Sequence, residues 1–335
     1  MILSLHPYQL KFKHPFKIAH GLRTHTDVVF VKLQHEGFTA WGEATLPPYL
    51  HETQQSVYAF IQDFEKRVSA NNVDEWFEKL NDDSPNNMAA KAALGMALWS
   101  LRAQMKRTSI GALLGIENSN PPLCTYTIGV STRSEMEQKV QEALQYGFQL
   151  FKIKLDGGDD ESAIKNFKAI CNKPFIVDVN QAWKSADEAN KKIAWLAGEQ
   201  CVAVEQPLKK EMLHEMKTVK QNSTLPIYAD ESCQTIEDIE KLKDCFDGIN
   251  IKLMKCGGIT PALAMIQKAK QLGLKILIGC MSESSIGCTA AAQLTPLADY
   301  ADLDGPYLLA NDPFDGMKVE GGRIALHGVV QRLEL

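Results

Sequence analysis

Six apolar runs in the second half of the chain end in charged residues, and these ends recur roughly every 25 residues. A short buried strand should not carry a charge, because burying an unpaired charge costs more than packing returns. Matching charged ends therefore predict one shared rim, such as the C-terminal rim of a parallel barrel. The charged residues at these ends are Lys152, Lys154, Asp178, Glu205, Asp230, Lys252, Asp302 and Asp304.

Three acids, Asp178, Glu205 and Asp230, stand at consecutive predicted strand ends. Clustered carboxylates repel one another, so at least one would hold a proton unless a cation removes the repulsion. Oxygen ligands without nearby His or Cys favour Mg²⁺. Any one acid alone could pair with a surface lysine or cap a helix, but three successive strand ends favour a site for one Mg²⁺ ion.

Two lysines, Lys154 and Lys252, lie on the second and sixth predicted barrel strands, nearly opposite each other. A lysine base needs a lowered pKa, which a neighbouring cation and partial burial supply. Two amines that flank one carbon could remove a proton from one face and return it to the other. A lone lysine at a strand end would instead be a solvated charge or an ion-pair partner. All eight His residues lie outside these strand ends, which argues against a histidine base.

The elements that would position these residues fall into two parts. From residue 123 to 310, strands and helices alternate, with Thr125-Tyr126-Thr127-Ile128 as the first of eight strands. This alternation predicts an α/β fold, a (β/α)8-type barrel or a modified (β/α)7β barrel in which the last helix is short or missing.

Residues 1–122 have a different pattern, with strand-like segments followed by helical ones, which is typical of an α+β capping domain. Residues 311–335, with Gly321-Gly322 as a turn, are expected to form added strands that return to this domain. The predicted strands span 2–12, 26–36 and 38–44, and the predicted helices span 53–69, 74–81 and 87–106.

Composition restricts the partners. The chain has 335 residues, 45% of them hydrophobic, and a net charge of −5, so it has a sizeable core and no basic footprint for nucleic acid. No uncharged run approaches a membrane span, and the N-terminus lacks the features of a signal peptide. Eight scattered cysteines without a Cys-x-x-Cys pair indicate a reducing compartment. We expect a cytoplasmic protein and leave open whether it forms a homo-oligomer.

At this point the ordered motifs resemble the enolase superfamily, specifically its muconate-lactonizing enzyme subgroup. The matching segments are Lys152-Ile153-Lys154, Asp178 with Asn180, Glu205-Gln206-Pro207, Asp230-Glu231-Ser232, Lys252 and Trp41-Gly42-Glu43-Ala44. The resemblance implies that the three acids bind Mg²⁺ and that Lys154 and Lys252 are the acid/base groups. It also implies that Lys152 neutralises a substrate carboxylate, and that a proton is abstracted α to that carboxylate through a metal-stabilised enediolate.

A further motif, Asp302-Leu303-Asp304, resembles the Asp-x-Asp signature of dipeptide epimerases, in which two acids hold the N-terminal ammonium of a dipeptide. The implied reaction is 1,1-proton transfer at the α-carbon of the C-terminal residue of an Ala-Glu or Ala-hydrophobic dipeptide. The alternative is a purely structural role, in which the acids form a turn before Gly305-Pro306; such a turn needs only one of the two acids.

Three other residues are candidates for substrate contact. The segment His20-Gly21-Leu22-Arg23-Thr24-His25 corresponds to a loop of the family's capping domain that closes over the site. Arg23 would meet the substrate side chain or else remain a solvated charge. Thr127 on the first barrel strand and Glu283 after the seventh are further expected pocket residues.

Alternative functions remain open at this point. o-Succinylbenzoate synthases and muconate cycloisomerases share the two lysines and the metal set, but their substrates carry no ammonium for Asp302 and Asp304. A Schiff-base aldolase could use Lys154 or Lys252, and borohydride trapping would detect it. A non-catalytic, metal-stabilised binding barrel would show no exchange of substrate protons with solvent.

Overall fold

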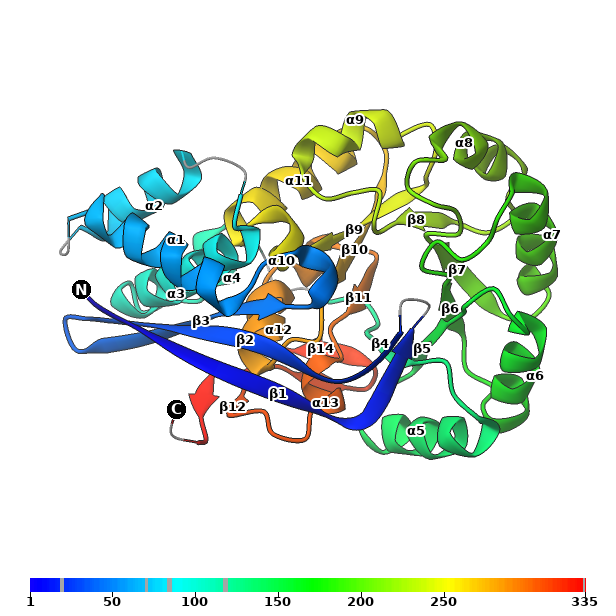
Figure 1. Cartoon of the computed structure of the whole chain (residues 1–335), viewed down its shortest axis with the longest axis horizontal. Helices are drawn as coiled ribbons and strands as arrows, with labels where there is room; N and C mark the ends of the chain where they lie inside the picture. The colour runs from blue at the N-terminus through cyan, green and yellow to red at the C-terminus, as the bar shows by residue number, and fades with distance from the viewer. Residues whose placement is uncertain (19–20, 70–71, 83–85, 117–119, 334) are drawn as a thin grey trace.

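The computed structural model describes residues 1–18, 21–69, 72–82, 86–116, 120–333 and 335. These residues form a cap of antiparallel strands and helices beside a ring of parallel strands surrounded by helices (Figure 1). Both chain ends lie on the side of the cap.

The cap begins with three antiparallel strands, β1 (Ile2–Ile18), β2 (Gly21–His35) and β3 (Phe38–Leu46). Glu36 and Gly37 have φ of 50° and 82°, so they form the predicted turn between β2 and β3. The apolar run from Val28 to Val31 is fully buried. The helical elements of the cap are η1 (Pro48–Leu50), α1 (Gln54–Lys66), α2 (Val73–Asp82), α3 (Met88–Met105) and α4 (Ile110–Leu113).

The barrel strands run parallel and neighbour one another in sequence order. The ring closes between the first and last strands, where the Ala301 N–H donates to the Leu123 carbonyl at 3.1 Å. The strands are β4 (Thr125–Ile128), β5 (Leu150–Lys154), β6 (Phe175–Asp178), β7 (Cys201–Glu205), β8 (Ile227–Ala229), β9 (Gly248–Lys252), β10 (Lys275–Gly279) and β11 (Tyr300–Asp302).

The helices on the outside of the ring confirm the predicted alternation, including the shortened end. The eighth strand is followed by the single turn α13, so the barrel is the modified form of the (β/α)8 fold. The helical elements are α5 (Arg133–Gln145), α6 (Asp160–Ile170), α7 (Ala186–Ala197), α8 (Leu213–Asn222), η2 (Ile236–Asp238), α9 (Ile239–Leu242), α10 (Leu253–Cys256), α11 (Ile259–Gln271), α12 (Ser285–Ala292), η3 (Thr295–Leu297) and α13 (Gly305–Leu308).

The C-terminal segment contacts both parts of the molecule. β12 (Phe314–Asp315) pairs with β15 (Val330–Gln331), and the Phe314 ring packs on Phe30 and Trp41 of the cap. The hairpin of β13 (Lys318–Glu320) and β14 (Arg323–Ala325) turns at Gly321-Gly322 and bridges to Leu123 beside the barrel.

One long arm of the cap, formed by β1 and β2, extends toward the first barrel strands (Figure 1). On its way the arm is fixed to α5, where His14 Nε2 lies 3.0 Å from a carboxylate oxygen of Glu142. Lys13 donates to the Tyr146 hydroxyl at 3.0 Å. Among the helices that the structure describes, none has the length and apolar character needed to cross a membrane.

Candidate active site

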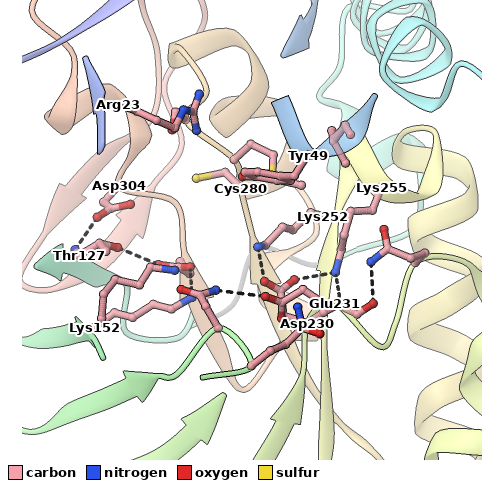
Figure 2. A pocket seen from close by; sticks show the side chains of 18 of the residues that line it. Arg23, Tyr49, Thr127, Lys152, Asp230, Glu231, Lys252, Lys255, Cys280 and Asp304 are labelled. Carbon is pink, nitrogen blue, oxygen red and sulfur yellow. Dashed lines mark hydrogen bonds and ion pairs between the residues drawn. The ribbon is translucent and has the colours of Figure 1, made fainter. Parts of the chain in front are cut away.

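A cavity of about 500 Å³ opens at the C-terminal ends of the barrel strands, below the cap. Its wall includes three lysines, Lys152, Lys154 and Lys252, and one acid, Asp230. The cap adds Arg23 and a short segment from Tyr49 to His51. Figure 2 shows Arg23, Tyr49, Lys152, Asp230 and Lys252, which come from distant parts of the sequence and lie around this cavity.

The three acids that the sequence grouped lie together at the base of this cavity. Asp178 ends β6, Glu205 ends β7 and Asp230 follows β8, and each is at most 5% exposed. One ligand atom from each lies within 4.8 Å of the others. Register explains the proximity, because Asp178 and Glu205 are direct partners on neighbouring strands.

The two oxygens of each of these carboxylates have different partners. One oxygen is anchored by a fixed protein donor: Asn180 N to Asp178 Oδ1 (3.1 Å), Asn250 Nδ2 to Glu205 Oε1 (2.9 Å) and Lys255 Nζ to Asp230 Oδ1 (2.7 Å). The other oxygens, Asp178 Oδ2, Glu205 Oε2 and Asp230 Oδ2, contact the amines that line the cavity. This arrangement presents one oxygen from each acid to a common point.

The electrostatics of the acids indicate a shortage of positive charge. Burial and the adjacent Asp178 raise the pKa of Glu205 to about 8. Burial also opposes ionisation of Asp178, yet Lys152 and Lys154 outweigh it and hold its pKa below the usual range. Burial first, and then like-charge repulsion, therefore disfavour full ionisation of the three acids. A buried set of hard oxygen donors with this deficit fits a divalent cation such as Mg²⁺.

The two candidate acid/base lysines face each other across the ring. Lys154 ends β5 and Lys252 ends β9, which are four strand positions apart in either direction around the barrel. Lys154 Nζ lies 2.6 Å from Asp178 Oδ2, and Lys252 Nζ lies 2.7 Å from Asp230 Oδ2. Burial disfavours the charged form of Lys252, but the Asp230 carboxylate outweighs burial and raises its pKa.

Lys152 lies deeper than the other two lysines and is 1% exposed. Its amine is 2.9 Å from Asp178 Oδ2, 2.8 Å from Glu205 Oε2 and 2.8 Å from Asp302 Oδ2. Burial opposes its charge, but these carboxylates raise the pKa of Lys152 well above its usual value. It is therefore a permanent cation at the centre of the site.

Asp302 and Asp304 both reach the cavity, but their environments differ. Asp302 ends β11 and already pairs with Lys152, and it accepts from the Thr125 hydroxyl at 2.6 Å. Asp304 precedes α13 and accepts from the Thr127 backbone N–H at 2.5 Å. Burial and the Asp302 carboxylate raise the pKa of Asp304 to about 7. Thr127 lines the same wall.

Two expectations about surrounding residues need correction. Residues 21–25 are not a loop, because they belong to β2, where Arg23 pairs with Phe16 of β1; His20 lies outside the described residues. Arg23 nevertheless lines the cavity from this strand. Glu283 lies behind the wall: it is 1% exposed, accepts from the Met281 N–H at 2.8 Å and is absent from the described lining of the cavity.

Several residues of the site escaped the sequence analysis. Tyr49 reaches over the cavity from η1, and its hydroxyl donates to the sulfur of Met281 at 3.3 Å. Lys255 and Asn250 anchor two of the acids. Only Lys255 carried a signal, since it stands one helical turn after Lys252 and directly before Cys256 and a Gly-Gly pair.

Comparison with known proteins places the chain in a family. Residues 135–328 match the family model "Enolase C-terminal domain-like", and residues 5–115 match "Mandelate racemase / muconate lactonizing enzyme, N-terminal domain". The chain belongs to this family of the enolase superfamily, which confirms the resemblance of its motifs.

Its relatives include several epimerases. The chain is 38% identical to the L-Ala-D/L-Glu epimerase of Bacteroides thetaiotaomicron, over 98% of this chain and 86% of the relative. It is 36% identical to the L-Ala-D/L-amino acid epimerase of Flavobacterium johnsoniae, over 97% and 96%. A solved dipeptide epimerase of Enterococcus faecalis, complexed with Mg and L-Leu-L-Tyr, has a TM-score of 0.88 and 31% identity over 98% and 97% of the two chains.

Proposed function

We propose that this chain is a Mg²⁺-dependent dipeptide epimerase that inverts the α-carbon of the C-terminal residue of a dipeptide. The observation that carries the proposal is the pair Lys154 and Lys252, which face one cavity from opposite strands beside three buried acids. The names of the relatives support the same reaction class, an isomerase acting on dipeptides.

Asp178, Glu205 and Asp230 would hold one Mg²⁺ ion through the oxygens that face the cavity. The bound ion would supply Lewis-acid stabilisation of the negative charge that builds on the substrate carboxylate when the α-proton leaves. Lys152, buried and permanently charged, adds a fixed cation to the same region, so the carboxylate would be held by preorganised positive charge.

Proton transfer falls to the two lysines. One amine, neutral at the start, takes the α-proton from its face of the carbon, and the other, charged at the start, donates a proton to the opposite face. The substrate is inverted, the proton count is unchanged, and the two lysines exchange protonation states. Because the lysines exchange roles, the reverse reaction uses the same groups.

The other end of the substrate would be oriented by the acidic side of the cavity. Asp304, with Asp302 behind it and Thr127 beside it, offers a carboxylate to the N-terminal ammonium of the dipeptide. Arg23 and the cap would surround the side chain at the epimerised residue. An arginine favours an Ala-Glu type substrate, whereas Tyr49, Leu50 and Met281 favour an Ala-hydrophobic one, and we keep both within the proposed class.

The decisive experiment follows deuterium in D₂O with both epimers of a dipeptide and added Mg²⁺. The wild type should interconvert the epimers and incorporate one deuterium at the C-terminal residue. Lys154→Ala and Lys252→Ala should each abolish epimerisation, and each should retain exchange with only one epimer, a different one for each variant. The exposed Lys165→Ala is the matched control. Epimerisation by either active-site variant would contradict the two-lysine assignment.

The alternatives have less support. o-Succinylbenzoate synthase and muconate cycloisomerase activities leave Asp304 without a cationic partner, and the compared relatives are epimerases. A Schiff-base aldolase would be trapped by borohydride at Lys154 or Lys252, and we expect no trapping. All eight cysteines are free, which supports a cytoplasmic location. Light scattering of the purified protein would test for a homo-oligomer.

A further inference from the structure

In each of the three acids, the carboxylate oxygen that does not contact the cavity amines accepts a hydrogen bond from another protein group. These donor groups differ in charge. Asp178 is anchored by a backbone N–H and Glu205 by the amide of Asn250, both neutral donors. Asp230 is anchored by the ammonium of Lys255 at 2.7 Å. A charge-assisted hydrogen bond is roughly twice as strong as a neutral one, so Asp230 has the most firmly held orientation.

Lys255 uses every donor that it has. An ammonium carries three N–H groups and no acceptor. Its three acceptors are the Asp230 carbonyl at 2.8 Å, Asp230 Oδ1 at 2.7 Å and the Asn250 carbonyl at 3.0 Å. The residue is 5% exposed. No donor remains for a substrate, so the residue acts on other protein groups.

The local backbone explains why two lysines reach the same carboxylate. β9 ends at Lys252, the single turn α10 follows, and Gly257 ends that turn with a φ of +92°. Lys252 is the N-cap of α10 and Lys255 is the third residue of that turn, and both amines reach the Asp230 carboxylate. Lys252 contacts Asp230 Oδ2 at 2.7 Å while Lys255 holds Oδ1 (Figure 2).

We propose that Lys255 is a positioning residue that fixes the Asp230 carboxylate with only Oδ2 directed at the metal position and at Lys252. This inference rests on the Mg²⁺ site proposed above. Mg²⁺ demands a near-ideal octahedral geometry, so each oxygen that binds it must be held in position. An unanchored Asp230 could rotate about its Cβ–Cγ bond, and Oδ2 would then leave the common point.

The direction of change in metal affinity separates positioning from simple charge. Removing a cation makes the site more negative, so electrostatics alone predicts tighter binding of a divalent ion to Lys255→Met. Loss of orientation predicts weaker binding, and groups that orient metal ligands typically contribute about 10- to 100-fold in affinity. We expect weaker binding of this size.

The test is titration of the metal-free full chain with Mn²⁺, followed by the electron paramagnetic resonance of the free ion, without any dipeptide. Lys255→Met should bind Mn²⁺ about 10- to 100-fold more weakly than the wild type. The exposed Lys270→Met is the matched control and should bind as the wild type does. Unchanged or tighter binding to Lys255→Met would overturn the proposal.

A second variant and a second readout keep the test decisive. If Lys255→Met does not fold, Lys255→Gln, which keeps a neutral donor, should still bind more weakly than the wild type; equal affinity would overturn the inference. In either variant, kcat should approach the wild-type value at saturating Mg²⁺, because the loss lies in metal affinity. A kcat that stays low there would contradict a role confined to positioning.

Failure of the proposed function gives a different result. A wild type that binds Mn²⁺ but epimerises no dipeptide would refute the function and leave the Lys255 comparison valid. A wild type that binds no Mn²⁺ would refute both. Wild-type Mn²⁺ affinity in the Lys255 variants would refute only the positioning role.

Discussion

At the scale of single residues, Asp304 shows how burial and one charged neighbour can tune substrate binding. Its pKa is raised to about 7, first by burial and then by Asp302. Below that pH the side chain holds a proton and cannot pair with an ammonium group. We therefore expect kcat/KM for a dipeptide to fall as the pH is lowered below about 7, measured as a pH profile.

Asp304→Asn provides the direct test of ammonium binding. A hydrogen bond to a charged group contributes about 1.5–3 kcal/mol, so kcat/KM should drop about 10- to 100-fold. The fall below pH 7 should also disappear, because the titrating group is gone. N-acetylated dipeptides, which lack the ammonium, are the control and should be much less affected. Equal losses for both substrates would refute the role of Asp304.

The residues on the barrel rim could be placed from sequence because a strand has a period of two and parallel strands share one C-terminal edge. Lys152, Lys154, Asp178, Glu205 and Lys252 all lie where this rule puts them. Tyr49 and Lys255 follow no such rule. Tyr49 comes from a short turn of the cap, and Lys255 comes from the single turn α10, which directly follows β9.

At the scale of elements, Gly42 lets β3 pack closely on α3. A Cβ atom built on Gly42 would lie 1.9 Å from the backbone oxygen of Ala93. Gly42→Ala would therefore push a strand away from a buried helix, and overpacking of this kind costs about 1–3 kcal/mol or more. We expect a clearly lower melting temperature by circular dichroism.

Gly328→Ala is the matched control for this substitution. A Cβ at Gly328 would meet no atom within 4 Å, so its melting temperature should equal that of the wild type. If Gly42→Ala melted at the same temperature as Gly328→Ala, the close packing of β3 on α3 would not contribute to stability as described.

The types of the elements could be predicted from the sequence where the hydrophobic period was clear. The arm formed by β1 and β2 could not be predicted in this way. His20 to His25 was expected to be a loop because the segment corresponds to a loop in the capping domain of the family that the chain resembles. In the structure the register shifts between Lys11 and Phe16, and this irregularity takes up Pro15 so that pairing resumes beyond it. A proline is tolerated at a bulge, which composition alone does not reveal.

At the scale of the whole molecule, Glu43 joins the cap to the barrel. It is fully buried, and it accepts from the Ser284 hydroxyl at 2.5 Å and from the Gly287 N–H at 3.1 Å. Both partners stand at the start of α12, just after the cavity residues Met281 and Ser282. The carboxylate thus holds the cavity wall against the cap.

Glu43→Gln should loosen this joint. The amide places N–H groups against donors, and unsatisfied buried groups cost about 1–3 kcal/mol each. We expect a lower melting temperature together with a raised KM and a smaller change in kcat, because the chemistry remains on the barrel. The exposed Glu65→Gln is the control. An unchanged melting temperature would show that the joint depends on other contacts.

Glu283 gives a pH dependence to the stability of the whole chain. Burial, and then Glu43, raise its pKa to about 8. The folded state therefore holds a proton that the unfolded state, with an ordinary carboxyl pKa near 4.3, has already released. Stability falls wherever the native state binds more protons, so this contribution weakens the fold from about pH 4.5 up to about pH 8.

Glu283→Gln resembles the protonated acid and should remove part of this slope. Thermal melts between pH 6 and pH 9 should show a smaller decline for the variant than for the wild type. The exposed Glu78→Gln is the control and should keep the wild-type slope. A variant slope as steep as that of the wild type would assign the pH dependence to other buried acids.

The cavity is lined by residues of both the cap and the barrel, and this has an evolutionary consequence. Arg23, Tyr49, Leu50 and His51 belong to the first 51 residues, whereas every lysine and acid assigned to catalysis belongs to the barrel. After a gene duplication, substitutions in the N-terminal segment could therefore change the substrate specificity while the catalytic residues of the barrel stay the same.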